Sequence, residues 1–269
     1  MMRCPTPISW RLPTGSCLCY HYDVTAIDVN ILTVDGTCTA ALCVPDSGGP
    51  SPAVIMYPDA GGLRDSFRDM GDRLSTMGYV VLVPDIYYRT PFVPFSMETV
   101  FTDDSERQRL FALMGTINPD KVGRDTAAFL DFLQARPEVH GSKVGTTGYC
   151  MGGRLSLIMA AEHADRIGAA ASFHGGHLAV DDDPESPHHL AKKVRATVYV
   201  GGAANDASFT EEHSQALAAA YTAAGVDFTI ENYPALHGYA VADNPSFDAS
   251  AAERHWAAMK SLYQSALHG

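Results

Sequence analysis

Short apolar runs alternate with longer amphipathic stretches along most of this chain, a pattern that predicts strands and helices in turn. Two strand-like runs come first, at Ala26–Val34 and Thr37–Val44, and Asp35-Gly36 between them is typical of a hairpin turn. Almost uninterrupted apolar runs, typical of buried parallel strands, follow. We expect these strands at Ala53–Tyr57, Tyr79–Val83, Lys143–Tyr149, Ile167–Phe173, Thr197–Gly201 and Phe228–Tyr233.

Helical periodicity separates most of these strands. Gly78 and Gly225 each follow a helical stretch, in the position that a C-capping glycine takes. The expected helices are Ser66–Met77, Val122–Gln134, Gly152–His163, Glu211–Ala224 and Ala251–Leu267. Such alternation predicts an α/β fold with a mostly parallel central sheet and helices on both faces.

The chain has 269 residues, enough for one large domain of this class. We expect an irregular lead-in at residues 1–23 and a single domain at residues 24–269. Residues 90–118 interrupt the alternation with a proline-containing loop and an expected helix around Ser105–Gly115. An insertion that follows a strand commonly forms a lid or a wall of the substrate site.

Composition excludes several classes of function. The net charge of −12 disfavours nucleic-acid binding, and no apolar run reaches the ~18 residues that cross a bilayer. The N-terminus lacks the apolar core of a secretion signal, so we expect a cytoplasmic protein with reduced thiols. Five of the six cysteines lie within the first 43 residues, at positions 4, 17, 19, 38 and 43. No CxxC pair occurs among them, so we expect no metal site.

The sixth cysteine stands in Gly148-Tyr149-Cys150-Met151-Gly152, the cysteine form of the G-x-S-x-G nucleophile elbow. A nucleophile on a sharp strand-to-helix turn has a strained backbone, and glycines two residues to either side remove side chains that would collide. An apolar strand precedes Cys150 and an apolar helix follows it, as an elbow requires. The alternative is a buried cysteine in a glycine-rich crossover.

A nucleophilic cysteine needs a base, and the base needs an orienting acid. Asp206 follows the strand Thr197–Gly201, and His237 follows the strand Phe228–Tyr233. The order cysteine, aspartate, histidine is that of the α/β-hydrolases. Asp243 is a competing acid, but it follows His237 and breaks this order.

Two backbone N–H groups are candidates for an oxyanion hole. One belongs to Met151 at the start of the helix after the elbow, and the other to Asp59, in a glycine-containing loop after the third strand. His174 follows the strand next to the elbow strand, so it either lines the pocket or is a structural histidine.

With these residues in place, the sequence resembles the dienelactone hydrolase family over residues 24–267. The motif Gly148-Tyr149-Cys150-Met151-Gly152-Gly153 carries most of the resemblance, and Pro84-Asp85-Ile86-Tyr87-Tyr88-Arg89 adds to it. The resemblance implies a Cys-His-Asp triad, no metal, no cofactor, and hydrolysis of lactones or small esters. Substrate-binding candidates are Arg89, His174, Tyr88 and Tyr149.

Two positions depart from the family pattern. Pro58 stands where enzymes acting on dienelactone have a glutamate, and Val241 stands where they have a second arginine that binds the substrate carboxylate. Arg89 could still bind an anion, or it could serve as a structural ion-pair partner. Dienelactone itself is therefore not the expected substrate.

The sequence predicts a hydrolase of small-molecule esters or lactones that acts as a monomer or small homo-oligomer. Three alternatives remain open: a thioesterase or peptidase with the same triad, a catalytically silent binding protein on this scaffold, and a redox sensor. No resolving cysteine lies near Cys150 in the sequence to favour the sensor.

Overall fold

The computed structural model describes residues 26–46 and 49–268. The expected lead-in at residues 1–23 and three of its cysteines, Cys4, Cys17 and Cys19, lie outside the described residues. Within the described part, the strands form one eight-stranded sheet in the order β1-β2-β4-β3-β5-β6-β7-β8. Their bounds are β1 Ile27–Thr33, β2 Gly36–Cys43, β3 Ala53–Tyr57, β4 Val80–Pro84, β5 Val144–Tyr149, β6 Ile167–Phe173, β7 Thr197–Ala203 and β8 Phe228–Tyr233.

The direction of the strands confirms the predicted mostly parallel sheet. β1 pairs antiparallel with β2, and β2 pairs antiparallel with β4. All other neighbours, from β4 through β8, run parallel. Because parallel strands end at the same edge, the loops after β3, β5, β6, β7 and β8 gather at one edge of the sheet.

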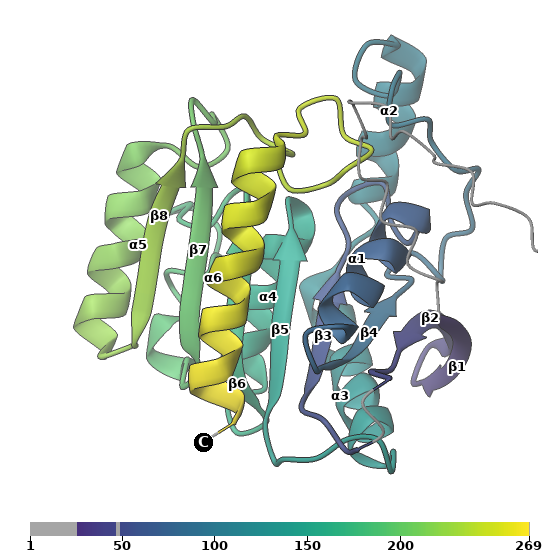
Figure 1. Cartoon of the computed structure of the whole chain (residues 1–269). Helices are drawn as coiled ribbons and strands as arrows, with labels where there is room; N and C mark the ends of the chain where they lie inside the picture. Colours follow the sequence, from purple (N-terminus) through teal and green to yellow (C-terminus); the bar gives the residue numbers. More distant parts are fainter. Residues whose placement is uncertain (1–25, 47–48, 269) are drawn as a thin grey trace, which may run out of the picture.

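Helices cover both faces, as expected (Figure 1). α1 and α6 lie on one face, while α3, α4 and α5 lie on the other. Their bounds are α1 Asp65–Ser75, α2 Asp104–Met114, α3 Pro119–Gln134, α4 Met151–Glu162, α5 Glu211–Ala224 and α6 Ala249–Leu267, with a short 3-10 turn η1 at Ala191–Lys193.

Alternation along the strands divides the core between the two faces. In β3, Val54 and Met56 pack with the α1 and α6 side, whereas Ile55 and Tyr57 pack with the α3 and α4 side. Every residue of β3 is buried, which explains why the sequence shows a continuous apolar run there instead of a period of two.

The insertion at residues 90–118 contains the expected helix as α2. Met97, Val100 and Leu110 from this segment form a small apolar cluster with Ala60, which lies in the loop after β3. The insertion therefore contacts the loop that carries the expected oxyanion donor Asp59.

Candidate active site

The turn from β5 into α4 has the geometry of a nucleophile elbow. Cys150 lies between the two elements with φ 54° and ψ −118°, a conformation that costs a non-glycine residue free energy. A Cβ atom added to Gly148 would overlap the carbonyl of Gly152, and one added to Gly152 would overlap the carbonyl of Tyr57. The two glycines of the motif are thus required by contacts with backbone, which cannot move aside.

Hydrogen bonds hold the elbow in place from both sides. The Cys150 N–H donates to the Phe173 carbonyl of β6 at 3.1 Å, and the Cys150 carbonyl accepts from the Gly153 N–H at 3.0 Å. Gly153 also packs closely, since a Cβ there would lie 2.6 Å from Ser172 Oγ. Cys150 and Met151 remain partly exposed, while Tyr149 and Gly152 on either side are buried.

The expected acid and base meet in the structure. His237 Nδ1 donates to Asp206 Oδ2 at 2.7 Å. The other carboxylate oxygen of Asp206 accepts from the Ser208 N–H at 2.9 Å and from the Ser208 hydroxyl at 2.6 Å. Burial opposes ionisation of Asp206, but the hydrogen bonds from His237 and Ser208 outweigh it and lower the pKa of the carboxyl to about 2.

The charge of His237 depends on both of its neighbours. Burial favours the neutral ring, yet the hydrogen bonds with Asp206 and with the Cys150 sulfur, together with the negative charges of both groups, raise the pKa of His237 to about 10. The sulfur of Cys150 therefore lies against the imidazole. A protonated ring in this position would stabilise negative charge on the neighbouring sulfur.

His174 lies beside His237. Its ring centroid is 5.0 Å from that of His237, the side chain is buried, and its φ of 39° is in the left-handed region. Neither ring nitrogen has a hydrogen-bond partner among the described residues. Burial and the adjacent His237 hold the pKa of His174 well below its usual range, so the ring is neutral.

The expected oxyanion donors lie in the loop after β3 and at the start of α4. The Asp59 side chain turns back to accept the Gly61 N–H at 2.9 Å. The backbone N–H groups of Asp59 and Ala60 have no hydrogen bond within the described residues. Met151 N–H belongs to the first turn of α4 and has no intrahelical partner, as expected at a helix start. Ala60 is thus a second candidate donor in this loop.

Two of the substrate-binding candidates, Arg89 and Tyr88, are paired with other residues of the chain. The Arg89 guanidinium donates to Asp125 at 2.6 Å and to Asp35 at 2.7 Å, and it stacks on the Tyr88 ring. The Tyr88 hydroxyl is bonded to Thr33 at 2.6 Å and to Asp125 at 2.9 Å. These pairings favour the structural role for Arg89 and Tyr88 over substrate binding, because the charge and the hydroxyl are already satisfied.

Tyr149, another substrate-binding candidate, lies in the core. The side chain is fully buried, stacks on Phe173 with centroids 5.7 Å apart, and its hydroxyl lies 3.2 Å from His255 Nε2. Alternation along β5 turns residue 149 into the core beneath the elbow. These contacts favour packing beneath the elbow over a place on the pocket surface for Tyr149.

Tyr87, which was not among the residues selected from the sequence, lies close to the candidate oxyanion donors. Its hydroxyl donates to the Ala60 carbonyl at 3.1 Å and lies 3.9 Å from Met151 Sδ. Burial raises the pKa of Tyr87, and the charges of Asp59 and Cys150 raise it further. The sequence alone could not distinguish Tyr87 from Tyr88, because residues in the loop after β4 do not alternate regularly between facing inward and facing outward.

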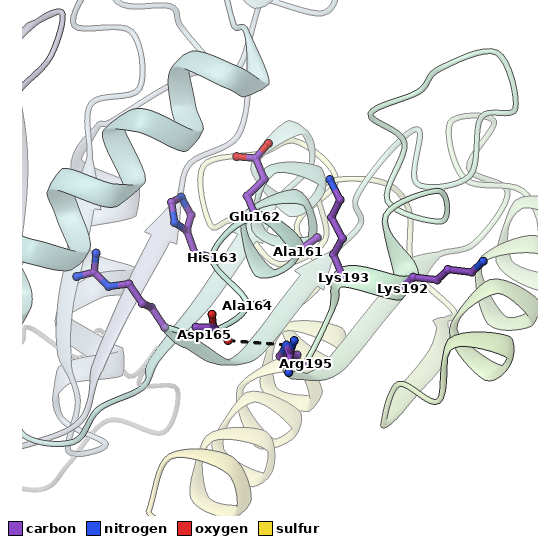
Figure 2. Close-up of a pocket in the computed structure, with 9 residues that line it drawn as sticks. Ala161, Glu162, His163, Ala164, Asp165, Lys192, Lys193 and Arg195 are labelled. Carbon is purple, nitrogen blue, oxygen red and sulfur yellow. Dashed lines mark ion pairs between the residues drawn. The ribbon is translucent and has the colours of Figure 1, made fainter.

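An open cavity of about 510 Å³ lies at the opposite end of α4 from Cys150 (Figure 2). Lys192, Lys193 and Arg195 border it, and Arg195 lies 3.8 Å from Asp165. The last carbonyls of α4 attract positive side chains to this end of the helix. The cavity therefore lies away from Cys150, which precedes the other end of this helix.

Two further findings concern the described residues alone. They contain no group of three or more histidine, cysteine or acidic side chains arranged to hold a metal ion. Among their helices, none combines the length and the apolar character that crossing a membrane demands.

Comparison with known proteins agrees with this architecture. A protein of Synechocystis sp., provisionally named a carboxymethylenebutenolidase, is 28% identical over 229 residues, which cover 84% of this chain and 91% of that protein. The carboxymethylenebutenolidase of Pseudomonas putida is 26% identical over 149 residues, covering 55% and 60%. A dienelactone hydrolase-like promiscuous phosphotriesterase from metagenomic libraries superimposes with a TM-score of 0.70 at 26% identity, covering 90% of this chain and 99% of that one. The model of the dienelactone hydrolase family matches residues 38–267, and the chain belongs to that family.

Proposed function

We propose that this protein hydrolyses carboxylic esters or lactones of small molecules, with Cys150 as nucleophile, His237 as acid and base, and Asp206 as the orienting acid. The observation that carries the proposal is the 2.7 Å hydrogen bond between His237 and Asp206, formed beside a cysteine held at a strained elbow. Family membership and the names of the relatives support ester-bond chemistry on small substrates.

In the first step the Cys150 thiolate attacks the substrate carbonyl, and a C–S bond forms while the carbonyl electrons move to oxygen. When the tetrahedral intermediate collapses, the C–O bond breaks and the imidazolium of His237 gives its proton to the leaving oxygen. A thioester remains on Cys150. Neutral His237 then takes a proton from water, which attacks the thioester and releases the acid and the thiolate.

The negative oxygen of each intermediate needs hydrogen-bond donors already in position. Met151 N–H at the start of α4 supplies one, aided by the positive end of the helix dipole. Asp59 N–H, or its neighbour Ala60 N–H, supplies the second. The hydroxyl of Tyr87 holds the Ala60 carbonyl and so restrains this loop.

The acyl group that fits this site is a neutral one. Val241 is fully buried and carries no charge, and Arg89 is already paired with two carboxylates. A substrate carboxylate would therefore have neither of the two arginines that bind it in family members acting on dienelactone. Uncharged aryl esters and simple lactones are the substrates we expect.

The test is an activity panel with p-nitrophenyl acetate, simple lactones, a thioester, an anilide and a phosphotriester, using wild type, Cys150→Ser and Cys150→Ala. We expect ester and lactone turnover in wild type and its loss in Cys150→Ala. Turnover near the wild-type rate in Cys150→Ala would overturn the assignment of the nucleophile. A wild type that acts only on the thioester or the anilide would support the thioesterase or peptidase alternative.

Alkylation with iodoacetamide tests the silent alternative. Burial raises the pKa of the Cys43 thiol to about 12 and also raises that of the Cys38 thiol, whereas Cys150 is partly exposed. Among the cysteines that the structure describes, Cys150 is therefore the one that we expect to alkylate first. A Cys150 that alkylates well below pH 8 indicates activation. Alkylation only near the ordinary thiol pKa of about 8.5, without turnover of any substrate, would instead indicate a silent binding protein.

A further inference from the structure

We infer that Arg64 is a positioning residue that fastens the loop carrying an oxyanion donor to the loop carrying the catalytic histidine. The first, the oxyanion loop, is residues 58–64 between β3 and α1. The second, the histidine loop, is residues 234–248 between β8 and α6. The inference rests on the proposed function, because it assigns those two loops their roles.

The guanidinium of Arg64 binds one carboxylate on each loop with two hydrogen bonds. Nη1 and Nη2 donate to the two oxygens of Asp59 at 2.7 and 3.0 Å. Nε and Nη2 donate to the two oxygens of Asp243 at 2.7 and 2.9 Å. Paired bonds of this kind set the orientation of both partners as well as their separation.

This contact is sheltered from water on one side. The side chain of Arg64 is 15% exposed and that of Asp59 is 6% exposed, while Asp243 is 34% exposed. The guanidinium also lies over the Phe67 ring, 4.9 Å from its centroid. Partial burial reduces screening by solvent, so this ion pair constrains the loops more than a surface pair would.

The oxyanion loop is shaped to admit the arginine. A Cβ atom on Gly61 would lie 2.9 Å from Arg64 Nη1, so glycine at this position leaves the space that the guanidinium uses. The Asp59 carboxylate that binds Arg64 also accepts the Gly61 N–H. Loss of Arg64 would therefore free the carboxylate that shapes the turn beneath the Asp59 and Ala60 N–H groups.

The histidine loop transmits a displacement of Asp243 to His237. Two turns connect them, closed by Val241 N–H to the Gly238 carbonyl at 3.1 Å and by Asn244 N–H to the Val241 carbonyl at 3.0 Å. Gly238, next to the histidine, has a φ of 97° and lies tightly against Asn244. The segment from 237 to 244 thus behaves as one unit held at its far end by Arg64.

Arg64→Gln is the variant that removes the contact, and Arg73→Gln is its matched control. Arg73 also lies on the α1 side, binds Glu253 of α6 at 2.7 Å and stacks on Trp256, but it touches neither loop. We expect Arg64→Gln to lower kcat for p-nitrophenyl acetate by about 10–100-fold with little change in KM, because small misplacements of reacting groups are costly. We expect the two variants to change the melting temperature by similar amounts, but Arg73→Gln should leave kcat unchanged.

The rate of Cys150 alkylation against pH gives a readout that does not need turnover. In Arg64→Gln we expect the midpoint to move up toward the ordinary thiol value of about 8.5, since His237 no longer stays against the sulfur. Gly61→Ala, which keeps all charges but displaces the guanidinium, should act in the same direction. A double-mutant cycle of Arg64→Gln with Asp243→Asn should show strong non-additivity in kcat.

The outcomes separate this inference from the proposed function. If wild type hydrolyses esters and Arg64→Gln matches Arg73→Gln in both kcat and alkylation midpoint, the inference is wrong and the function stands. If wild type hydrolyses nothing in the panel, the function fails, and a shifted alkylation midpoint in Arg64→Gln still supports the positioning role. Additive effects in the double-mutant cycle would overturn the link through Asp243.

Discussion

His237 Nδ1 and Asp206 Oδ2 lie 2.7 Å apart although 31 residues separate them in the chain. The two residues leave neighbouring parallel strands, β7 and β8, at the same edge of the sheet. A backbone bond from Ala204 N–H to the Ala235 carbonyl at 2.8 Å ties their loops together. The sheet therefore brings the two residues close together, and the bonded loops set the orientation of their side chains.

Asp206→Asn should lower kcat for p-nitrophenyl acetate by about 10²–10⁴-fold, because an amide presents a donor where His237 needs an acceptor and selects the wrong tautomer. Ser208→Ala is the matched control: it removes one hydroxyl bond to the other carboxylate oxygen and leaves the acceptor for His237 in place. We expect it to cost about tenfold or less. Equal losses in the two variants would contradict the role given to Asp206.

The raised pKa of His237 can be measured by NMR titration of labelled histidine, with His237→Gln used to assign the signal. We expect a value near 10 in wild type and a lower one in Cys150→Ala, which lacks the sulfur beside the ring. Because the folded pKa lies above the unfolded value of about 6.5, the stabilisation by this pairing is complete below pH ~6.5 and is lost as pH rises through about 10. A signal that titrates near 6.5 in both proteins would contradict the ion pair.

Gly148→Ala should destabilise the fold by about 1–3 kcal/mol or more, since its Cβ would overlap the backbone of Gly152. Gly115→Ala is the control. Gly115 has a φ of −63°, and its nearest atom to an added Cβ is the Ala112 carbonyl oxygen at 3.4 Å. There we expect a change within about 0.5 kcal/mol in urea unfolding. Two equally stable variants would show that the elbow does not need glycine.

Arg89→Gln should leave the ratio of kcat/KM for a carboxylate-bearing ester to that for a neutral ester unchanged. It should lower the melting temperature, because Asp125 loses its cation in a position where the side chain is only 4% exposed. Arg107→Gln, which removes a surface pair with Asp104, should change neither quantity. A selective loss of activity on the anionic ester would restore Arg89 as a substrate-binding residue.

Most elements of the fold follow from local patterns. The bounds that the sequence predicts agree with the structure for β3, β6, α5 and β8. This agreement is expected because apolar runs and capping glycines are signals within consecutive residues. The candidate nucleophile elbow is also a local feature, because the glycines around Cys150 are required by backbone contacts within five residues and with the end of the adjacent strand β3. The order of Asp206 and His237 follows from the topology of parallel strands.

The direction in which individual side chains point, and the partners that they bind, depend on the tertiary structure. Arg89 is neutralised by Asp35 and Asp125, and Arg64 binds Asp243 from 179 positions away, so no local pattern reveals either pairing. Tyr149 faces the core while Tyr87 faces the site. The sequence by itself determined the elements, the elbow and the candidate triad, since these depend on periodicity, steric need and strand order. Only the tertiary structure decided which charges are already paired and which loops are tied together, because such contacts form between residues that the chain brings close only when it folds.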